Sequence, residues 1–89
     1  MRAIVTVIGK DRVGIIADVC TLLASYGINI LDINQTVLQE YFTMMMLVDM
    51  SGCKTPFDEV SKALKSKGED SALSIRIQRE DIFEAMHRI

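Results

Sequence analysis

The chain has 89 residues, of which 49% are hydrophobic and 25% charged, and its formal net charge is −2. This composition predicts one globular domain and excludes a disordered chain. No apolar run reaches about 18 residues and no basic block occurs, so we expect neither membrane spanning nor nucleic-acid binding.

The first predicted elements are a strand, a turn between two glycines and a helix. Residues 3–8 form an almost unbroken apolar run rich in β-branched side chains, which indicates a strand buried on both faces. Gly9 and Gly14 bracket the turn, and Asp11 is the expected N-cap of the helix. The helix carries one apolar stripe, made of Ile15, Ile16, Val19, Leu22, Leu23 and Tyr26. Gly27 is expected to end the helix in the left-handed conformation.

Two further strands follow as a predicted antiparallel hairpin. Apolar and polar residues alternate from residue 28 to residue 39, which indicates a strand with one solvated face or a strand at a sheet edge. The apolar members of this alternation are Leu31, Ile33 and Val37. A tight connection at residues 40–41 leads to a second, nearly continuous apolar run over residues 42–50.

The second helix and the last strand complete the domain. Thr55 is the expected N-cap, Pro56 the first helical residue and Gly68 the end of the helix. Residues 73–78 then alternate between apolar and polar side chains, which predicts a half-exposed strand. A short apolar stripe at helical spacing closes the chain and consists of Ile82, Phe83, Met86 and Ile89.

The predicted order, β-α-β-β-α-β followed by a tail helix, is that of the α+β ferredoxin-like fold. Right-handed crossovers place both main helices on one face of an antiparallel four-stranded sheet, with the first and third strands at its centre. We expect one domain over residues 1–79 and an amphipathic helical tail over residues 80–89.

The second face of this predicted sheet is also apolar. In the third strand, Met45 and Leu47 point away from the two main helices. Such side chains exposed together would exceed an ordinary surface patch. Either a second subunit or the tail helix must cover them, so the sequence predicts a homo-oligomer, for which a two-fold dimer is the commonest form.

The turn before the first helix is the expected functional site. The free N–H groups at the start of a helix carry a partial positive charge, which suits a small anion. Gly14 has no side chain, so a ligand can approach the backbone there.

The residues around this turn resemble one known family. Residues 9–17 contain the run Asp-Arg-Val-Gly-Ile, and residues 22–30 end in Gly-Ile-Asn-Ile, a pattern similar to that of the ACT domain. The resemblance covers residues 3–78. Shorter segments also resemble small stand-alone bacterial and archaeal ACT proteins related to the glycine cleavage system repressor; these are residues 35–37, 41–44 and 81–86.

The resemblance implies a stand-alone regulatory module that binds a free amino acid or a related small molecule where two subunits meet, and that acts through a regulated partner protein. One side of the implied site is the turn, and the other is the start of the second strand of the neighbouring chain. The turn side comprises Asp11, Arg12, Val13, Gly14 and Ile15, and the strand side comprises Asn29 and Ile30.

Within the implied site, the amides near Gly14 suit a ligand carboxylate, and Asn29 offers a donor and an acceptor for an amino or amide group. Arg12 either pairs with a carboxylate or is simply solvated. Asp11 is better explained as a helix cap than as a ligand contact. A ligand this small implies a Kd between about 1 mM and 1 μM.

Other functions fit the sequence less well. RNA-binding versions of the fold need stacking aromatics and a basic surface, and the first strand has no aromatic residue. The only histidine, His87, has no nucleophile near it, and no metal-ligand cluster occurs, so we expect no catalysis, metal or cofactor. A dimerisation or interaction module without a ligand stays open, because the methionine-rich third strand suits an adaptable partner surface.

The spacing of the two cysteines indicates the cellular compartment in which we expect the protein. Cys20 and Cys53 are far apart and form no Cys-x-x-Cys pair, and the N-terminal segment resembles a strand rather than a signal peptide. We therefore expect free thiols, with Cys20 buried and Cys53 a passive loop residue, in a cytoplasmic protein.

Overall fold

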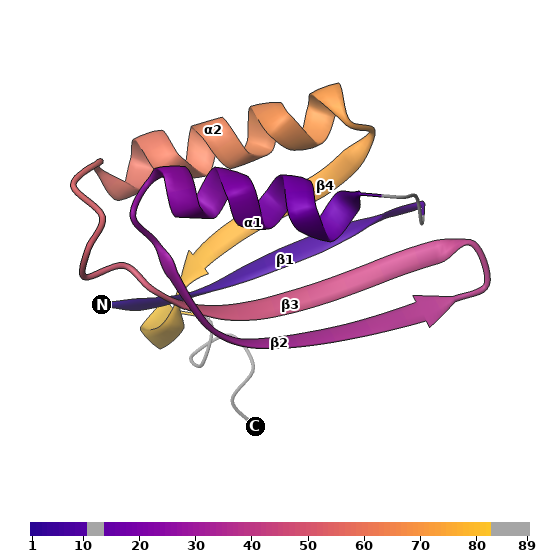
Figure 1. The fold of residues 1–89 in the computed structure, drawn as a ribbon, viewed down its shortest axis with the longest axis horizontal. Coiled ribbons are helices and arrows are strands. Elements are labelled where there is room, and N and C mark those ends of the chain that lie inside the picture. Colours follow the sequence, from indigo (N-terminus) through magenta and orange to yellow (C-terminus); the bar gives the residue numbers. More distant parts are fainter. Residues whose placement is uncertain (11–13, 83–89) are drawn as a thin grey trace.

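The computed structural model describes residues 1–10 and 14–82. The elements are β1 (Arg2–Lys10), α1 (Ile15–Ser25), β2 (Asn29–Leu38), β3 (Tyr41–Asp49), α2 (Phe57–Asp70) and β4 (Leu73–Arg79). The four strands form one antiparallel sheet in the order β2-β3-β1-β4, so β1 and β3 are central. Both helices lie on one face of this sheet (Figure 1), and residues 80–82 are helical. The predicted ferredoxin-like arrangement is confirmed.

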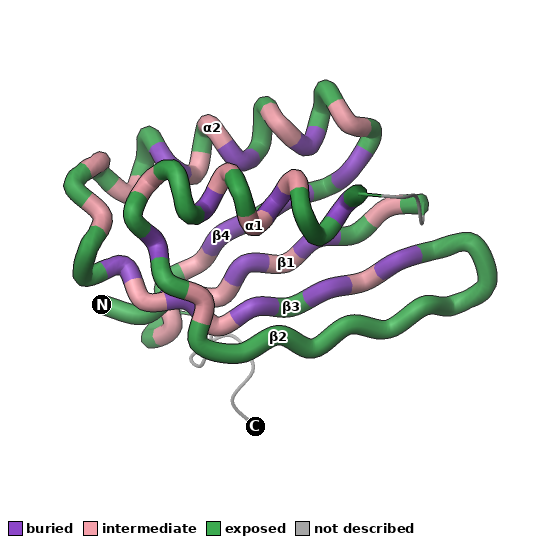
Figure 2. Tube along the Cα trace, in the orientation of Figure 1, coloured by how far each residue is buried: buried purple, intermediate pink, exposed green. Residues whose placement is uncertain are grey.

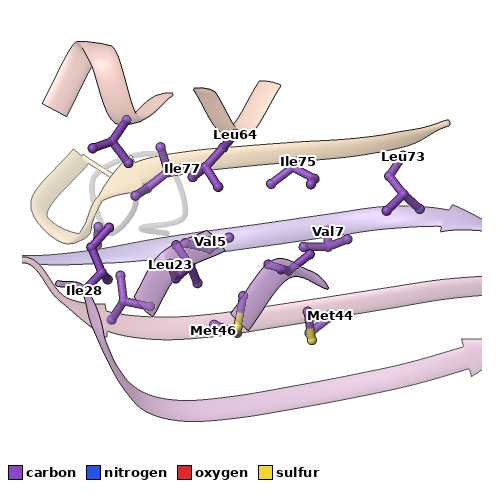
Figure 3. Packing of buried hydrophobic residues seen from close by; sticks show 14 of the residues in the cluster. Val5, Val7, Leu23, Ile28, Met44, Met46, Leu64, Leu73, Ile75 and Ile77 are labelled. Atoms are coloured by element: carbon purple, nitrogen blue, oxygen red, sulfur yellow. The ribbon is translucent and has the colours of Figure 1, made fainter. Parts of the chain in front are cut away.

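The hydrophobic core lies between the sheet and the two helices (Figure 3). Every second residue of the central strands points into it, and the helices contribute residues at helical spacing. The largest fully buried side chains are Val5, Val7, Met44, Met46 and Val48 from the strands and Val19, Leu23, Val60 and Leu64 from the helices. The prediction that Met45 and Leu47 of the third strand point away from the two main helices is therefore confirmed.

The other face of the central strands is only partly covered. Ile8 is 48% exposed and Met45 is 38% exposed, while Ile4 and Leu47 are half-buried. The prediction that residues 3–8 are buried on both faces is therefore wrong for the single chain. The reason is that both main helices pack on the same side of the sheet, as Figure 1 shows.

Strand β2 lies at the edge of the sheet, as its alternation predicted. Its apolar side chains nevertheless remain in solvent: Leu31 is 46% exposed, Ile33 39% and Val37 54%. Figure 2 shows the strand exposed along almost its whole length, whereas β1, β3 and β4 each contain several buried residues. A register shift between Ile30 and Asp32 interrupts its pairing with β3.

Two helix boundaries differ from the sequence predictions. Gly68 does not end α2, which continues to Asp70. The glycine is buried, and there is no room for a side chain, because a Cβ would lie 2.7 Å from the carbonyl oxygen of Leu73. Thr55 is not the N-cap either, since Pro56 occupies that position and its carbonyl accepts the amide of Val60 at 3.1 Å.

A glycine in the left-handed conformation lies at each end of α1. Gly27 has φ +74°, which confirms its predicted left-handed conformation after the helix. The N-cap position of α1 is Gly14, with φ +90° and no side-chain cap. Asp11, the expected N-cap, lies outside the described residues.

Candidate functional site

The start of α1 is an open corner of the molecule. Gly14 is exposed, and a Cβ built on it would meet nothing within 4 Å among the described residues. Its left-handed conformation, at φ +90°, is one that side-chain-bearing residues rarely adopt. Both observations fit the prediction that a ligand can approach the backbone at this position.

The backbone amides at this corner are the available donors. The first intrahelical hydrogen bond runs from the amide of Asp18 to the carbonyl of Gly14, at 2.9 Å. The amides of residues 14–17 precede that bond and have no intrahelical partner, so they concentrate the positive end of the helix dipole. Asp18, an acidic residue in the first turn, partly offsets that charge.

Ile15 contributes to this corner only through its backbone. Its side chain is 2% exposed and belongs to the core between the helices and the sheet. Residues 11–13, which include the predicted contacts Asp11, Arg12 and Val13, lie outside the described residues.

The strand side of the predicted site lies at the end of the molecule opposite to Gly14. Asn29 and Ile30 begin β2, where Asn29 is exposed and paired with Asp49, and Ile30 is half-buried against the core. Helix α1 separates them from Gly14, and its 11 residues span about 16 Å. A single chain therefore does not bring the two halves together (Figure 1).

The structure adds two hollows that sequence reasoning missed. The larger, of about 400 Å³, lies between the outer side of α2 and the free edge of β4, and is lined by Ser61, Lys65, Glu69 and residues 73–78. The smaller, of about 320 Å³, lies between the helices beside Asp18 and Lys67. Their lining residues are ordinary surface types in the sequence, so no motif marks them.

Two titratable groups are perturbed by their surroundings. Hydrogen bonds from the Ser51 hydroxyl at 2.6 Å and the Ser51 amide at 2.9 Å hold the pKa of Asp49 below its ordinary value. Burial raises the pKa of the Cys20 thiol, which is half-buried against the core.

Within residues 1–10 and 14–82, no cluster of histidine, cysteine and carboxylate side chains is placed to hold a metal ion. No helix of this part of the chain is long and apolar enough to cross a membrane. His87 lies outside the described residues.

Comparison with known proteins places this fold and turn in one family. The ACT domain family matches residues 2–78. A UPF0237 protein of Listeria monocytogenes is 55% identical over 89 residues, which is 100% of both chains. The solved ACT domain protein from Streptococcus pneumoniae has a TM-score of 0.83 and 47% identity over 98% of each chain.

A longer protein of known structure also shares the fold. The crystal structure of a candidate glycine cleavage system transcriptional repressor has a TM-score of 0.73 and 26% identity, covering 86% of this chain and 44% of that one. These matches agree with the resemblance drawn from the turn and from the Gly-Ile-Asn-Ile segment. The chain belongs to the ACT domain family.

Proposed function

We propose that two copies of this chain bind a free amino acid, or a closely related metabolite, where the start of α1 of one copy meets the start of β2 of the other. The observation that carries the proposal is the open corner at Gly14, where a helix start presents its amides beside a left-handed glycine. In this role the protein is a sensor that acts through a regulated partner protein.

The exposed edge of β2 supplies the pairing that this site needs. Ten residues of backbone, Asn29–Leu38, form the outer edge of the sheet, and such an edge readily accepts another strand. Antiparallel pairing of two β2 strands over their full length sets Asn29 of the partner subunit opposite Leu38. Leu38 pairs with Tyr41 and Tyr41 with Lys10, at the same end of the molecule as Gly14 (Figure 1).

The chemistry of the two halves is complementary to an amino acid. The amides of residues 14–17 suit the α-carboxylate, and Asn29 of the partner subunit offers a carbonyl oxygen to the α-amino group. A single charge at an exposed helix terminus is stabilised by only about 0.3–1 kcal/mol. We therefore expect a Kd between about 1 μM and 1 mM, which suits an abundant metabolite.

Titration calorimetry with each of the twenty amino acids tests this function. Gly14→Leu places a side chain in the open corner, whereas the matched control Gly14→Ala carries the same backbone strain with little bulk. We expect binding to one or a few amino acids, at least about tenfold weaker binding in Gly14→Leu than in Gly14→Ala, and a similar loss in Asn29→Ala. Asn34→Ala, on the same strand, is the control for Asn29.

Absence of heat from every amino acid at millimolar concentration contradicts the proposal. The alternative is then a dimerisation or interaction module without a ligand. The apolar side chains of β2 that remain in solvent, Leu31, Ile33 and Val37, favour that second function.

A further inference from the structure

The larger of the two hollows, of about 400 Å³, follows the free edge of β4, and we call it the β4 groove. Its lining includes six consecutive residues of the strand, 73–78. Successive side chains of a strand point to opposite faces, so a hollow on one face would be lined by every second residue only. The groove therefore runs along the backbone edge of β4. Its other wall is one stripe of α2, made of Ser61, Lys65 and Glu69.

The packing of α2 on β4 positions this wall. The buried stripe of the helix consists of Val60, Leu64 and Gly68, and an added Cβ on Gly68 would lie 2.7 Å from the carbonyl oxygen of Leu73. Each lining residue of α2 follows one residue of the buried stripe, so the wall stands directly beside the contact between helix and strand. The groove is therefore formed by two regular elements that the core holds together.

The edge of β4 offers hydrogen-bonding groups to the groove. The strand pairs with β1 on one side and lies at the outer edge of the sheet, beside α2 (Figure 1). In an antiparallel ladder every second residue of an edge strand directs its N–H and C=O outward, which is about three or four of the seven residues of β4. An extended peptide that adds to such an edge gains main-chain hydrogen bonds, and its alternate side chains enter pockets beside the edge.

Two cations border the β4 groove, Lys65 on the wall and Arg76 on the strand, and both are exposed. Over residues 1–10 and 14–82, neither of them forms an ion pair. Glu69 is the carboxylate among the lining residues, so two positive charges and one negative charge leave the lining with a net charge of +1. The groove is therefore complementary to a segment that carries more than one carboxylate.

We propose that the β4 groove binds an extended acidic segment of a partner protein, which adds to the sheet as a fifth strand. Ile75 and Ile77 are buried under the helices, so Arg76 between them points to the other face, whereas Lys65 lies on the helix side. Neighbouring residues of the added strand also point to opposite faces. Two carboxylates at adjacent positions of the segment therefore reach both cations.

This inference goes beyond the proposed function, because one copy of the chain forms the groove. It needs neither an amino acid nor the pairing of two β2 strands. The strand order β2-β3-β1-β4 leaves β4 free in a dimer that is paired through β2, so both contacts can form at once.

A second copy of the chain fits the edge of β4 poorly. Two β4 strands related by a two-fold axis at Arg76 place this residue opposite Arg76 of the partner subunit. The next registers that keep the buried face on the helix side shift the pairing by two residues, and the two arginines are then diagonal neighbours about 7–8 Å apart. Like charges at these positions disfavour pairing, and charged side chains commonly protect edge strands from self-association. The same charge attracts an acidic strand.

A peptide titration followed by the amide NMR signals of the full chain tests the proposal. The probe is an end-capped peptide of alternating valine and threonine, as long as β4, with Glu-Asp at its centre; the control peptide has Gln-Asn there. We expect shifts of the amide signals of Leu73–Arg79 and of the α2 wall, and binding of the control at least about tenfold weaker.

Three results of this titration would overturn the inference. The first is an acidic peptide that shifts no signals, and the second is a set of shifts confined to Asn29–Leu38, which assigns strand addition to the β2 edge. The third is a change at β4 that grows with protein concentration in the absence of peptide, which assigns the edge to a second copy.

Reversal of the two charges tests the role of Lys65 and Arg76. We expect the double variant Lys65→Glu, Arg76→Glu to bind the acidic peptide at least about tenfold more weakly and to prefer a peptide with Lys-Arg at its centre. Lys62→Glu is the matched control, since Lys62 is exposed on the same helix but does not line the groove. A double variant with the peptide preference of Lys62→Glu would contradict the proposal.

Methylation of the peptide backbone tests strand addition itself. Alternate amides of an extended peptide point in opposite directions, so only one set faces the edge of β4. Two versions of the acidic peptide carry N-methyl groups on the one or the other set. We expect one version to bind like the unmethylated peptide and the other at least about tenfold more weakly. Two versions that bind alike would overturn strand addition.

The two proposals fail in different ways. Calorimetry with amino acids reports the site between α1 and β2, whereas the peptide titration reports the β4 groove. A Lys65→Glu, Arg76→Glu variant that has lost the acidic peptide but binds amino acid with the affinity of the unmodified chain separates the two sites directly.

Discussion

Two glycine-containing loops contact each other at the end of the molecule that carries the start of β2, and this contact supports a quantitative stability prediction. A Cβ on Gly27 would lie 2.7 Å from the carbonyl oxygen of Gly52, and a Cβ on Gly52 would lie 2.9 Å from the carbonyl oxygen of Gly27. Gly27 also has φ +74°, whereas no positive φ occurs at Gly52. Alanine at Gly27 therefore meets both backbone strain and a backbone clash.

The two effects can be separated with three variants. Gly14→Ala carries strain alone, because its φ is +90° and nothing lies within 4 Å of the added methyl group. Gly52→Ala carries the clash alone, and Gly27→Ala carries both. Left-handed backbone strain is worth about 1 kcal/mol and an overpacked contact about 1–3 kcal/mol. We therefore expect losses of about 1, 1–3 and 2–4 kcal/mol for Gly14→Ala, Gly52→Ala and Gly27→Ala.

Urea denaturation followed by circular dichroism measures these free energies of unfolding. For a domain of 89 residues, about 1 kcal/mol corresponds to a shift in Tm of about 4–8 °C, so the expected loss in Gly27→Ala lowers the Tm by about 8–32 °C. A Gly27→Ala variant that is as stable as Gly14→Ala would refute the reasoning, since the contact with Gly52 would then have no energetic consequence.

Three further predictions concern single residues. Gly68→Ala pushes a methyl group to 2.7 Å from the Leu73 carbonyl oxygen, so we expect a loss of about 1–3 kcal/mol by denaturation, although alanine normally favours a helix. Burial raises the pKa of the Cys20 thiol, so iodoacetamide should alkylate Cys20 more slowly in the folded chain than in urea at the same mildly alkaline pH; equal rates would contradict this. Asp49 has a lowered pKa because Ser51 donates two hydrogen bonds to it, so its contribution to stability is present above the ordinary pKa of about 3.9 and is lost as the pH falls through the lowered value. The difference in Tm between the unmodified chain and Asp49→Asn should therefore shrink in acid, and a difference that grows on acidification would exclude this account.

Local sequence patterns predicted the element order, the central strands and most of the core. The helical stripe in α1 correctly predicted that Val19 and Leu23 face the core, and the strand period in β3 correctly predicted that Met45 and Leu47 point away from the helices, because these periodicities follow from backbone geometry. The left-handed glycine at residue 27 was also predictable, since it requires only a local conformation.

Features that depend on distant elements were not predictable in the same way. The sequence predicts a helix stop at Gly68, but this residue is a site of close approach between α2 and β4, which only the folded structure shows. The exposure of Ile33 and Val37 depends on how far the helices extend over the sheet, and a strand pattern does not contain that information.

In the candidate site, too, local features were predictable from the sequence and features that depend on distant elements were not. The conformation of Gly14 follows from the local turn, and it agrees with the expected open approach to the backbone. The distance between Gly14 and Asn29 follows from the length of α1, and it means that one chain supplies only half of the proposed pocket. The other half depends on an intermolecular contact, for which the sequence supplies only the exposed edge and face of the sheet.

A crystal structure of the protein purified without removal of its natural ligand tests the sensor function most directly. The account predicts density for a small carboxylate-bearing molecule between the amides of residues 14–17 and Asn29 of the partner subunit. A structure in which Gly14 faces bulk solvent, with Asn29 of every neighbouring chain far from it, would contradict the account.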